Sequence, residues 1–292
     1  QVYGGGAHRH RRAHDGEADL SAVFAVAEEL AEHATHDLVI VMKRTVPVGT
    51  NTLVQRRAME YAASQDIPVF LHAQDPWLAG DGCAHEGAVS VRLGLPGIPE
   101  AAETIAVARE LHLIEQTGVR AHFCQLSSER AANMIARAQH DGQSVTADVA
   151  AHQLFLTEMD IGYFDSQCHV QPPLRTQRDR DGLRLALQRG TIGAICSDHQ
   201  PHDRDAKLAP FPTSEPGISG LETLLPLTLR LVDEGVCSLS QAIASITQAP
   251  ADIVGLSAGL AVGETADVCV FDPEQDCALV ADSMLSQGKN SP

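Results

Sequence analysis

Short apolar runs of strand length alternate with longer helical segments over most of this 292-residue chain. Strands are expected at residues 67–71, 119–126, 144–149 and 194–196. Helices are expected at residues 52–65, 100–117, 128–141, 179–189, 221–233 and 240–247. Because strands that alternate with helices form parallel sheets, the pattern predicts an α/β fold, either a parallel sheet or a barrel. Hydrophobic residues make up 44% of the chain and aromatic residues 4%, which suits a core of Ala, Val, Leu and Ile.

The strand at 194–196 is followed directly by residues of catalytic type, Asp198, His199 and His202. A carboxylate at the carboxyl end of a buried strand lies where an α/β barrel keeps its catalytic groups. Such an aspartate can bind a metal ion and take a proton from metal-bound water. His202, on the following loop, could reach an anionic substrate. The alternative is that Asp198 caps the next turn and that the histidines are polar loop residues.

Two further strands end in polar groups, the first at His72 and the second in the segment from His122 to Gln125. In a parallel barrel these strand ends meet at one mouth. Imidazole and carboxylate groups suit zinc, so the strand ends form a candidate metal cradle. A catalytic zinc needs about three or four protein ligands, however, and His72 and Asp198 supply fewer than that.

Charge and cysteine content narrow the classes of function. The net charge of -17 argues against broad binding to nucleic acids or to anionic membranes. The cysteines number seven and form no CxxC pairs, which favours reduced thiols in a cytoplasm. Cys124 and Cys196, beside strand ends, are expected to be buried and inert. No apolar stretch approaches about 18 residues and no signal peptide opens the chain, so we expect a cytoplasmic protein without a membrane span.

A first resemblance to a known family covers residues 15–51. The segment from Asp15 to Leu20, followed by KRTVPVGT from Lys43 to Thr50, resembles part of the UDP-glucose 6-dehydrogenase family. This resemblance implies a Rossmann-like fragment in which Thr45 lies near NAD. The glycine-rich fingerprint that binds the pyrophosphate of a dinucleotide is missing, so we expect neither NAD binding nor dehydrogenase activity.

A second and more specific resemblance covers residues 56–292. An ordered series of segments is similar to the C-terminal part of the dihydroorotase family: 72–75, 94–100, 122–127, 145–154, 172–175, 197–202, 216–218 and 263–272. The resemblance implies a TIM barrel of amidohydrolase type. It also implies the family reaction of pyrimidine synthesis, in which metal-activated water interconverts dihydroorotate and N-carbamoyl-aspartate, with zinc as the metal.

The dihydroorotase resemblance assigns a role to each matching residue. His72 matches a metal-ligand histidine, and Asp198 matches the aspartate that binds metal and acts as general base and acid. His202 matches a histidine that holds the substrate carboxylate. Pro216 and Gly217 match positions at which the backbone contacts the substrate.

Several departures from the family pattern argue against catalysis by this chain. The first barrel strand of the family, with its His-x-His pair and substrate-binding arginine, and the bridging Asp or carboxylated Lys have no counterpart here. Gln125 stands where a second single metal histidine belongs, and Gln171 replaces a substrate-binding asparagine. A glutamine amide is a poor zinc ligand beside imidazole, so we expect zinc not to be retained. These changes resemble inactive dihydroorotase-like subunits that serve as structural partners of aspartate transcarbamoylase.

The two resemblances divide the chain into a disordered basic arm at 1–14, a dehydrogenase-like fragment at 15–51, a partial barrel at 52–262 and the start of a C-terminal β segment at 263–292. A strand is expected at 266–271 within the last part. The barrel is incomplete, because the chain can supply about five or six of the eight strands. An open sheet edge exposes unpaired backbone groups, so we expect an oligomer or association with a partner. Two main interpretations remain open, a cyclic amidohydrolase and a non-catalytic scaffold, and a nucleotide-sugar dehydrogenase fragment is a weaker third.

Four other residues have structural interpretations. His85 is expected in a loop or at the start of a helix. Trp77, the single tryptophan, is expected to anchor the packing. His152 is expected to form structural hydrogen bonds, and Arg175 is expected to pair with a loop carboxylate or with carbonyl groups.

Overall fold

The computed structural model describes residues 50–292 apart from 258, 260–261, 264, 266 and 276–278. The expected basic arm at 1–14 lies outside the described residues, and so does almost all of the expected dehydrogenase-like fragment at 15–51, including Thr45.

Four parallel strands form the central sheet, in the order β1-β4-β5-β6. Their bounds are Val69–His72 for β1, Ala121–Cys124 for β4, Val145–Ala150 for β5 and Ala194–Cys196 for β6. His72 pairs with Cys124, and Ala150 pairs with Cys196, so the carboxyl ends of the strands lie along one edge. A separate pair of short parallel strands joins β2 (Ala84–His85) to β3 (Gly97–Ile98). The prediction of a parallel α/β sheet is confirmed.

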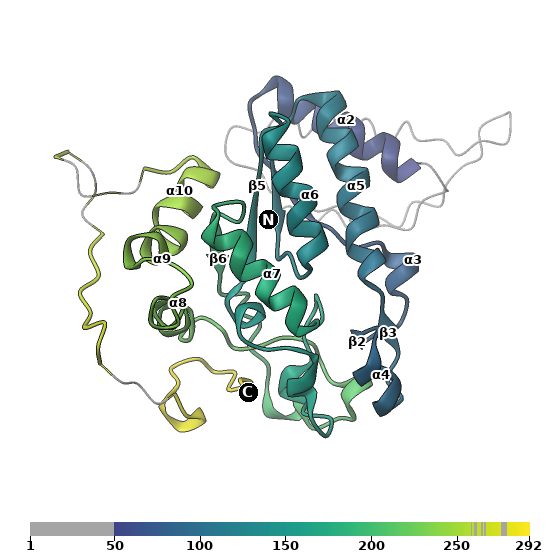
Figure 1. Ribbon diagram of the computed structural model, residues 1–292, viewed down its shortest axis with the longest axis vertical. Coiled ribbons are helices and arrows are strands. Elements are labelled where there is room, and N and C mark those ends of the chain that lie inside the picture. Colours follow the sequence, from purple (N-terminus) through teal and green to yellow (C-terminus); the bar gives the residue numbers. More distant parts are fainter. Residues whose placement is uncertain (1–49, 258, 260–261, 264, 266, 276–278) are drawn as a thin grey trace, which may run out of the picture.

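Helices pack along the sheet as the sequence pattern predicts. Figure 1 shows α5, α6 and α7 lying side by side over one face, while α8 and α9 lie beside β6 and α10 packs against α9. The helices are α2 (Thr50–Ser64), α3 (Pro76–Ala79), α4 (Ala88–Leu93), α5 (Glu100–Thr117), α6 (Glu129–His140), α7 (Gln177–Gln188), α8 (Leu224–Asp233), α9 (Leu239–Ile246) and α10 (Gln248–Val254). Short 3-10 turns lie in the connecting loops: η1 (Ala151–Leu154), η2 (Glu158–Ile161), η3 (Ser166–Cys168), η4 (Arg204–Lys207), η5 (Phe211–Thr213) and η6 (Ala281–Ser283). None of the helices within the described residues is long and apolar enough to cross a bilayer.

Local sequence signals account for the ends of the longer helices. Helix α6 begins after Ser128, whose hydroxyl accepts a hydrogen bond from the backbone N–H of Ala131 and so caps the first turn. Helix α7 begins with a capping box between Thr176 and Asp179. Helix α5 ends at Gly118, whose φ of 67° is left-handed and favours glycine.

The two faces of the central sheet differ in chemistry. Phe123, Ala147 and Val149 are fully buried and belong to the main hydrophobic core, where the helices cover the sheet. Successive strand residues point to opposite faces, so His122 and Asp148 point the other way. The inner face of the sheet therefore carries polar side chains directly below the loops that follow the strands.

Three expectations for individual segments are wrong. Trp77 lies on the short helix α3 with 88% of its surface exposed, so it does not anchor the packing. His85 lies in the short strand β2 rather than in a loop. The described residues 267–271 form no strand, and Val268 and Val270 stay exposed because no neighbouring strand pairs with them. Within the described residues the central sheet has four strands. The five or six strands expected of the whole chain stay a prediction, because residues 1–49 lie outside the described part.

Candidate active site

The ends of β4 and β6 bring Gln125 and Asp198 into direct contact. Gln125 follows β4 and Asp198 lies just beyond β6, and both adopt left-handed φ angles, 57° and 43°. Such angles are uncommon outside glycine and turn each chain sharply as its strand ends. Nε2 of Gln125 donates a hydrogen bond of 2.5 Å to Oδ1 of Asp198. Nε2 of Gln200 donates to the same oxygen at 2.9 Å.

The Asp198 carboxylate is buried, with 4% of its side chain exposed. Burial raises the pKa of Asp198, the hydrogen bond from Gln200 opposes this, the carboxylate of Asp148 raises it further, and nearby His72 lowers it. The second oxygen, Oδ2, lies 3.9 Å from Nε2 of His152. Complete burial lowers the pKa of His152 to about 4, so this imidazole is neutral near pH 7. No hydrogen bond joins the two side chains, so the structural hydrogen bond expected of His152 is not made with Asp198.

A second group of predicted residues lies on the loops after β6. Nε2 of His202 is 2.9 Å from the carbonyl oxygen of Pro216, and the N–H of Gly217 donates to the carbonyl of His169 at 2.8 Å. Gly217 has a φ of 134°, and a Cβ there would lie 2.5 Å from Cβ of Gln200. Glycine is therefore required here by both conformation and space.

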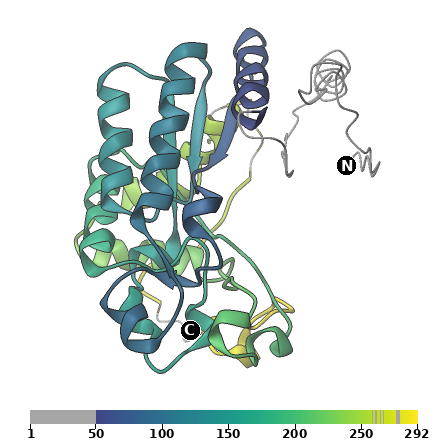
Figure 2. The same ribbon diagram turned by 90° about the vertical axis from the view of Figure 1, so that its right-hand side faces the viewer.

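Asn290 holds this second group together from the C-terminal segment. Its Oδ1 accepts hydrogen bonds from the N–H of His202 at 2.8 Å and from the hydroxyl of Ser219 at 2.9 Å. Its Nδ2 donates to the carbonyl oxygens of Gln200 at 2.8 Å and Gly217 at 3.0 Å. Figure 2 shows the C-terminal segment, in yellow, beside the green loops at the lower end of the molecule. A residue far away in sequence thus fixes the loop that carries His202 and Gly217.

A buried lysine fixes the other side of the same loop. Nζ of Lys207 donates to three carbonyl oxygens, those of Ser166 at 3.1 Å, His169 at 3.3 Å and Glu215 at 2.6 Å. Burial lowers the pKa of Lys207 to about 8. The backbone from Glu215 to Gly217 is therefore held from two sides.

The remaining predicted residues lie at the margin of the site. His72 ends β1, is exposed, and is close enough to Asp198 to lower the pKa of that carboxyl. Gln171 is exposed on the loop between η3 and α7 and takes no part in the described hydrogen bonds around Asp198 and His202. The structure thus brings together Gln125 with Asp198, and His202 with Pro216 and Gly217, while Gln171 stays apart.

Comparison with known proteins identifies the family. The sequence model of the amidohydrolase family matches residues 11–289. This chain belongs to the amidohydrolase family. A dihydroorotase-like protein of Pseudomonas putida is 53% identical over 243 residues, which cover 83% of this chain and 57% of that protein. A dihydroorotase of Syntrophotalea carbinolica is 40% identical over 292 residues, covering 97% of this chain and 68% of that protein. The predicted membership among dihydroorotase-like amidohydrolases is confirmed, and the chain spans little more than half of the Pseudomonas relative.

Solved structures support the same fold. A D-hydantoinase from Thermus sp. matches 78% of this amidohydrolase and 53% of its own chain, with a TM-score of 0.69 and 23% identity. A dihydropyrimidinase from Brevibacillus agri matches 87% of this chain and 57% of its own, with a TM-score of 0.69 and 20% identity. The TIM-barrel-like α/β fold predicted for this amidohydrolase is confirmed. The resemblance of residues 15–51 to a dehydrogenase fragment stays a prediction.

Among the described residues, the side chains at the mouth do not gather three metal-ligand atoms around Asp198. Members of the family typically use metal ions. Here two amide groups already occupy Oδ1 of Asp198, and Gln125 offers a weak ligand beside imidazole. One group of metal-ligand atoms lies within 4.8 Å of one another among the described residues, and it consists of His122, Cys124 and Asp148. This group includes neither His72 nor Asp198.

Sequence reasoning missed three side chains that shape the site. Gln200 lies two residues after Asp198, in a stretch whose acid and histidines alone supplied the prediction. Asp148 alternates along β5 with core residues, a period-two pattern that could have revealed its inner-face position. Asn290 carries no local signal, because its partners lie some 70–90 positions earlier in the chain.

Arg175 is buried and pairs partly as expected. Arg175 does pair with a carboxylate, but that group is Glu103 of helix α5, at 3.6 Å, rather than a loop residue. Nε of Arg175 also donates to the hydroxyl of Ser127 at 2.7 Å.

Burial raises the pKa of Cys124 to about 12, and burial together with Asp148 raises the pKa of Cys196. Both residues are partly rather than fully buried, which differs from the expectation. Their raised pKa values keep the thiols protonated and poorly nucleophilic near pH 7.

Proposed function

We propose that this amidohydrolase is a dihydroorotase-like protein that binds dihydroorotate or N-carbamoyl-aspartate at its mouth without converting one into the other. The observation that carries the proposal is the pair of glutamine amides on Oδ1 of Asp198. Hydrogen bonds from these two amides reduce the basicity of Oδ1, which disfavours proton abstraction through that oxygen and leaves Oδ2 as the oxygen that could meet a substrate or a water molecule. An amide N–H donates a hydrogen bond to Oδ1 but cannot relay a proton to it at neutral pH.

Ligand recognition rests on the loop that holds His202. Because the carbonyl of Pro216 can only accept, Nε2 of His202 carries the hydrogen in their 2.9 Å contact. Nδ1 is then left for a ligand, and it donates to a carboxylate when the imidazole is protonated. Asn290 and Lys207 hold the backbone around this histidine and Gly217, which favours a preformed carboxylate site.

Calorimetry and a turnover assay on the purified chain test this proposal. With Zn²⁺ present, we expect binding of N-carbamoyl-aspartate or dihydroorotate but no conversion. H202A should weaken binding by about tenfold or more, because a hydrogen bond to a charged group contributes about 1.5–3 kcal/mol. H112A, at an exposed histidine of helix α5, is the matched control and should bind like the parent protein. Turnover that D198A abolishes would contradict the proposal.

A second candidate function is that of a non-catalytic scaffold for aspartate transcarbamoylase. Its support is the exposed inner face of the edge strand β1, where Phe70 has 45% of its surface exposed beside the ring of His122. Together with the amides on Asp198, this face favours a role in assembly over a role in catalysis. The six free cysteines among the described residues favour a reducing compartment such as the cytoplasm. We also retain, as part of this proposal, the division of the chain into segments that end at residues 14, 51 and 262.

Light scattering after size-exclusion chromatography tests the scaffold. We expect the protein alone to be oligomeric or loosely ordered, and to form a defined complex when aspartate transcarbamoylase from the same organism is added. A monodisperse monomer that unfolds in one sharp transition and does not bind the transcarbamoylase would refute this second function.

A further inference from the structure

A cluster of metal-ligating side chains lies on the inner face of the sheet, one layer below Asp198. His122 and Cys124 come from β4, and Asp148 comes from β5. One ligand atom from each of the three, a ring nitrogen, a thiol sulfur and a carboxylate oxygen, lies within 4.8 Å of the other two. The sequence pattern placed the segment from His122 to Gln125 among the strand ends at the mouth, whereas Asp148 was not among the residues predicted there.

Hydrogen bonds within the cluster and from two neighbouring residues orient His122 and Asp148. Nε2 of His122 lies 2.9 Å from Oδ2 of Asp148, while Nδ1 lies 2.7 Å from the hydroxyl of Thr146. The other carboxylate oxygen, Oδ1, accepts the backbone N–H of Gln125 at 2.7 Å. Metal-binding histidines and carboxylates are commonly held in place by such outer hydrogen bonds, which fix the ring and aim the free lone pair.

A second sulfur lies on the neighbouring strand. Cys196 ends β6, which pairs with β5, and its thiol is hydrogen-bonded to Asp148. Its sulfur lies outside the group of atoms that are all within 4.8 Å of one another, so it would have to move toward the other three ligands. One imidazole, two thiols and one carboxylate form the kind of mixed four-ligand set that binds zinc tetrahedrally. Soft sulfur ligands also disfavour magnesium and calcium, which prefer oxygen.

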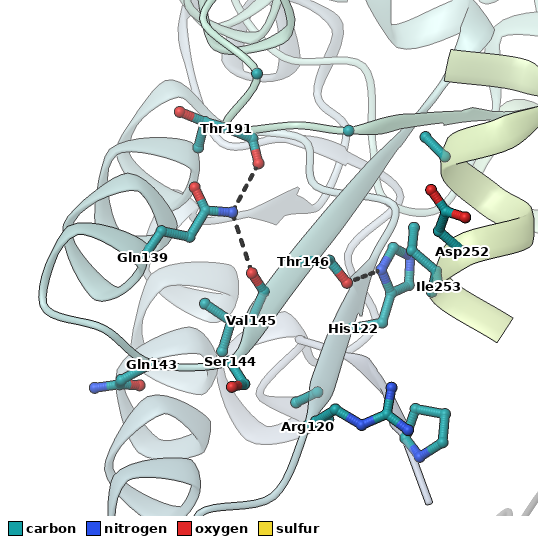
Figure 3. Close-up of a pocket in the computed structure, with 15 residues that line it drawn as sticks. Arg120, His122, Gln139, Gln143, Ser144, Val145, Thr146, Thr191, Asp252 and Ile253 are labelled. Atoms are coloured by element: carbon teal, nitrogen blue, oxygen red, sulfur yellow. Dashed lines mark hydrogen bonds between the residues drawn. The ribbon is translucent and has the colours of Figure 1, made fainter. Parts of the chain in front are cut away.

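A pocket reaches one of the four side chains, His122. It has a volume of about 410 Å³, opens at the amino ends of β4 and β5, and is lined by His122 and Thr146. Figure 3 shows the His122 ring pointing toward Thr146, with Asp252 and Ile253 of helix α10 on the other side of the pocket. The pocket therefore lies at the end of the sheet opposite to Asp198.

We propose that His122, Cys124, Asp148 and Cys196 bind one transition-metal ion of the zinc class through thiolate sulfur. The ion replaces the hydrogen bonds that now join these side chains to Asp148, and it displaces the two thiol protons. Because its ligands come from β4, β5 and β6, the ion cross-links three adjacent strands and has a structural role. The site uses none of the side chains proposed for ligand binding at the mouth, although Asp148 also accepts the backbone N–H of Gln125.

Cobalt(II) is the probe, because a cobalt–thiolate bond gives a sulfur-to-metal charge-transfer absorption that histidine and carboxylate ligands do not give. The chelator-treated full chain is titrated with cobalt, and we expect this absorption to saturate at one ion per chain. C124S and C196S should each reduce it, while C237S, at a partly buried thiol elsewhere, should leave it unchanged. T146V should keep the absorption but weaken cobalt affinity by about tenfold or more, because it removes an outer hydrogen bond.

Two further variants protect the conclusion. D148N keeps the shape of the carboxylate, so it tests the ligand set with less risk of misfolding, and it should weaken cobalt binding. D198A changes the mouth alone and should leave the sulfur absorption intact. A parent protein that binds cobalt without sulfur absorption, or whose absorption persists in both C124S and C196S, would overturn the proposal.

Discussion

Replacing Asn290 by alanine tests how strongly the C-terminal segment holds the loop of His202. The side chain of Asn290 makes hydrogen bonds to His202, Ser219, Gln200 and Gly217. Ser219 can turn its hydroxyl to the carbonyl of Gly288, which it already contacts at 2.7 Å. The N–H of His202 and the carbonyls of Gln200 and Gly217 therefore lose the partner that they have in the folded protein.

The expected loss in the free energy of unfolding is about 3 kcal/mol, since each buried group left without a partner costs about 1 kcal/mol. The melting temperature should then fall by about 6–12 °C, because 1 kcal/mol corresponds to about 2–4 °C in a chain of this size class. Urea unfolding followed by circular dichroism is the assay. The exposed indole of Trp77 makes fluorescence a poor reporter of burial.

A matched control makes this measurement decisive. Asn133 is exposed on helix α6, so N133A makes the same chemical change without removing a buried contact. We expect N133A to be neutral or slightly stabilising, because alanine favours helix. A loss in N290A of less than about 0.5 kcal/mol, or one equal to that in N133A, would refute the view that Asn290 braces the loop.

Two other predictions concern buried titratable groups. The pKa values of His152 and His169 are lowered to about 4 by burial, whereas the unfolded chain binds these protons near 6.5. The contribution of each histidine to the free energy of unfolding is therefore complete above about pH 6.5. It is lost as the pH drops toward 4, and the loss is about 3 kcal/mol for each histidine. Urea unfolding at pH 7 and pH 5 checks this, H152Q should reduce the difference, and equal stability at the two pH values would contradict it. R175M leaves Glu103 buried without its cation and should cost about 3–5 kcal/mol in the same assay. Recovery of part of that loss in the double variant R175M/E103Q is expected, and an unaltered midpoint in R175M would count against a buried ion pair.

Local pattern was sufficient to predict most of the elements. The helix expected at 100–117 agrees with α5 at both ends, because Pro99, the acidic first turn and Gly118 are all signals of the sequence itself. Strands β1, β4 and β5 lie within two residues of their expected bounds, since apolar runs and flanking turns define them locally. The pattern failed at Trp77 and at 267–271, where burial and strand pairing depend on neighbours that a local window does not contain.

Part of the candidate site also followed from strand topology. Parallel strands end at the same edge, so Asp198 and the segment around Gln125 were expected to lie close together. Their contact at 2.5 Å agrees with this expectation. That His72 and Asp198 share a metal ion stays a prediction. The contacts around Asp198 do not favour it, because the amides of Gln125 and Gln200 both donate to Oδ1 of that carboxylate.

The sequence by itself determined the α/β alternation, the family and the strand ends at which polar side chains gather, because each of these is written in short stretches of neighbouring residues. The tertiary structure alone decided which of those side chains meet. The brace of Asn290 on His202 joins positions 88 residues apart, and the cluster of His122, Cys124 and Asp148 depends on the register of β4 with β5. Hydrogen bonds reach about 3 Å, so a partner is chosen by the final packing of the chain and not by its order.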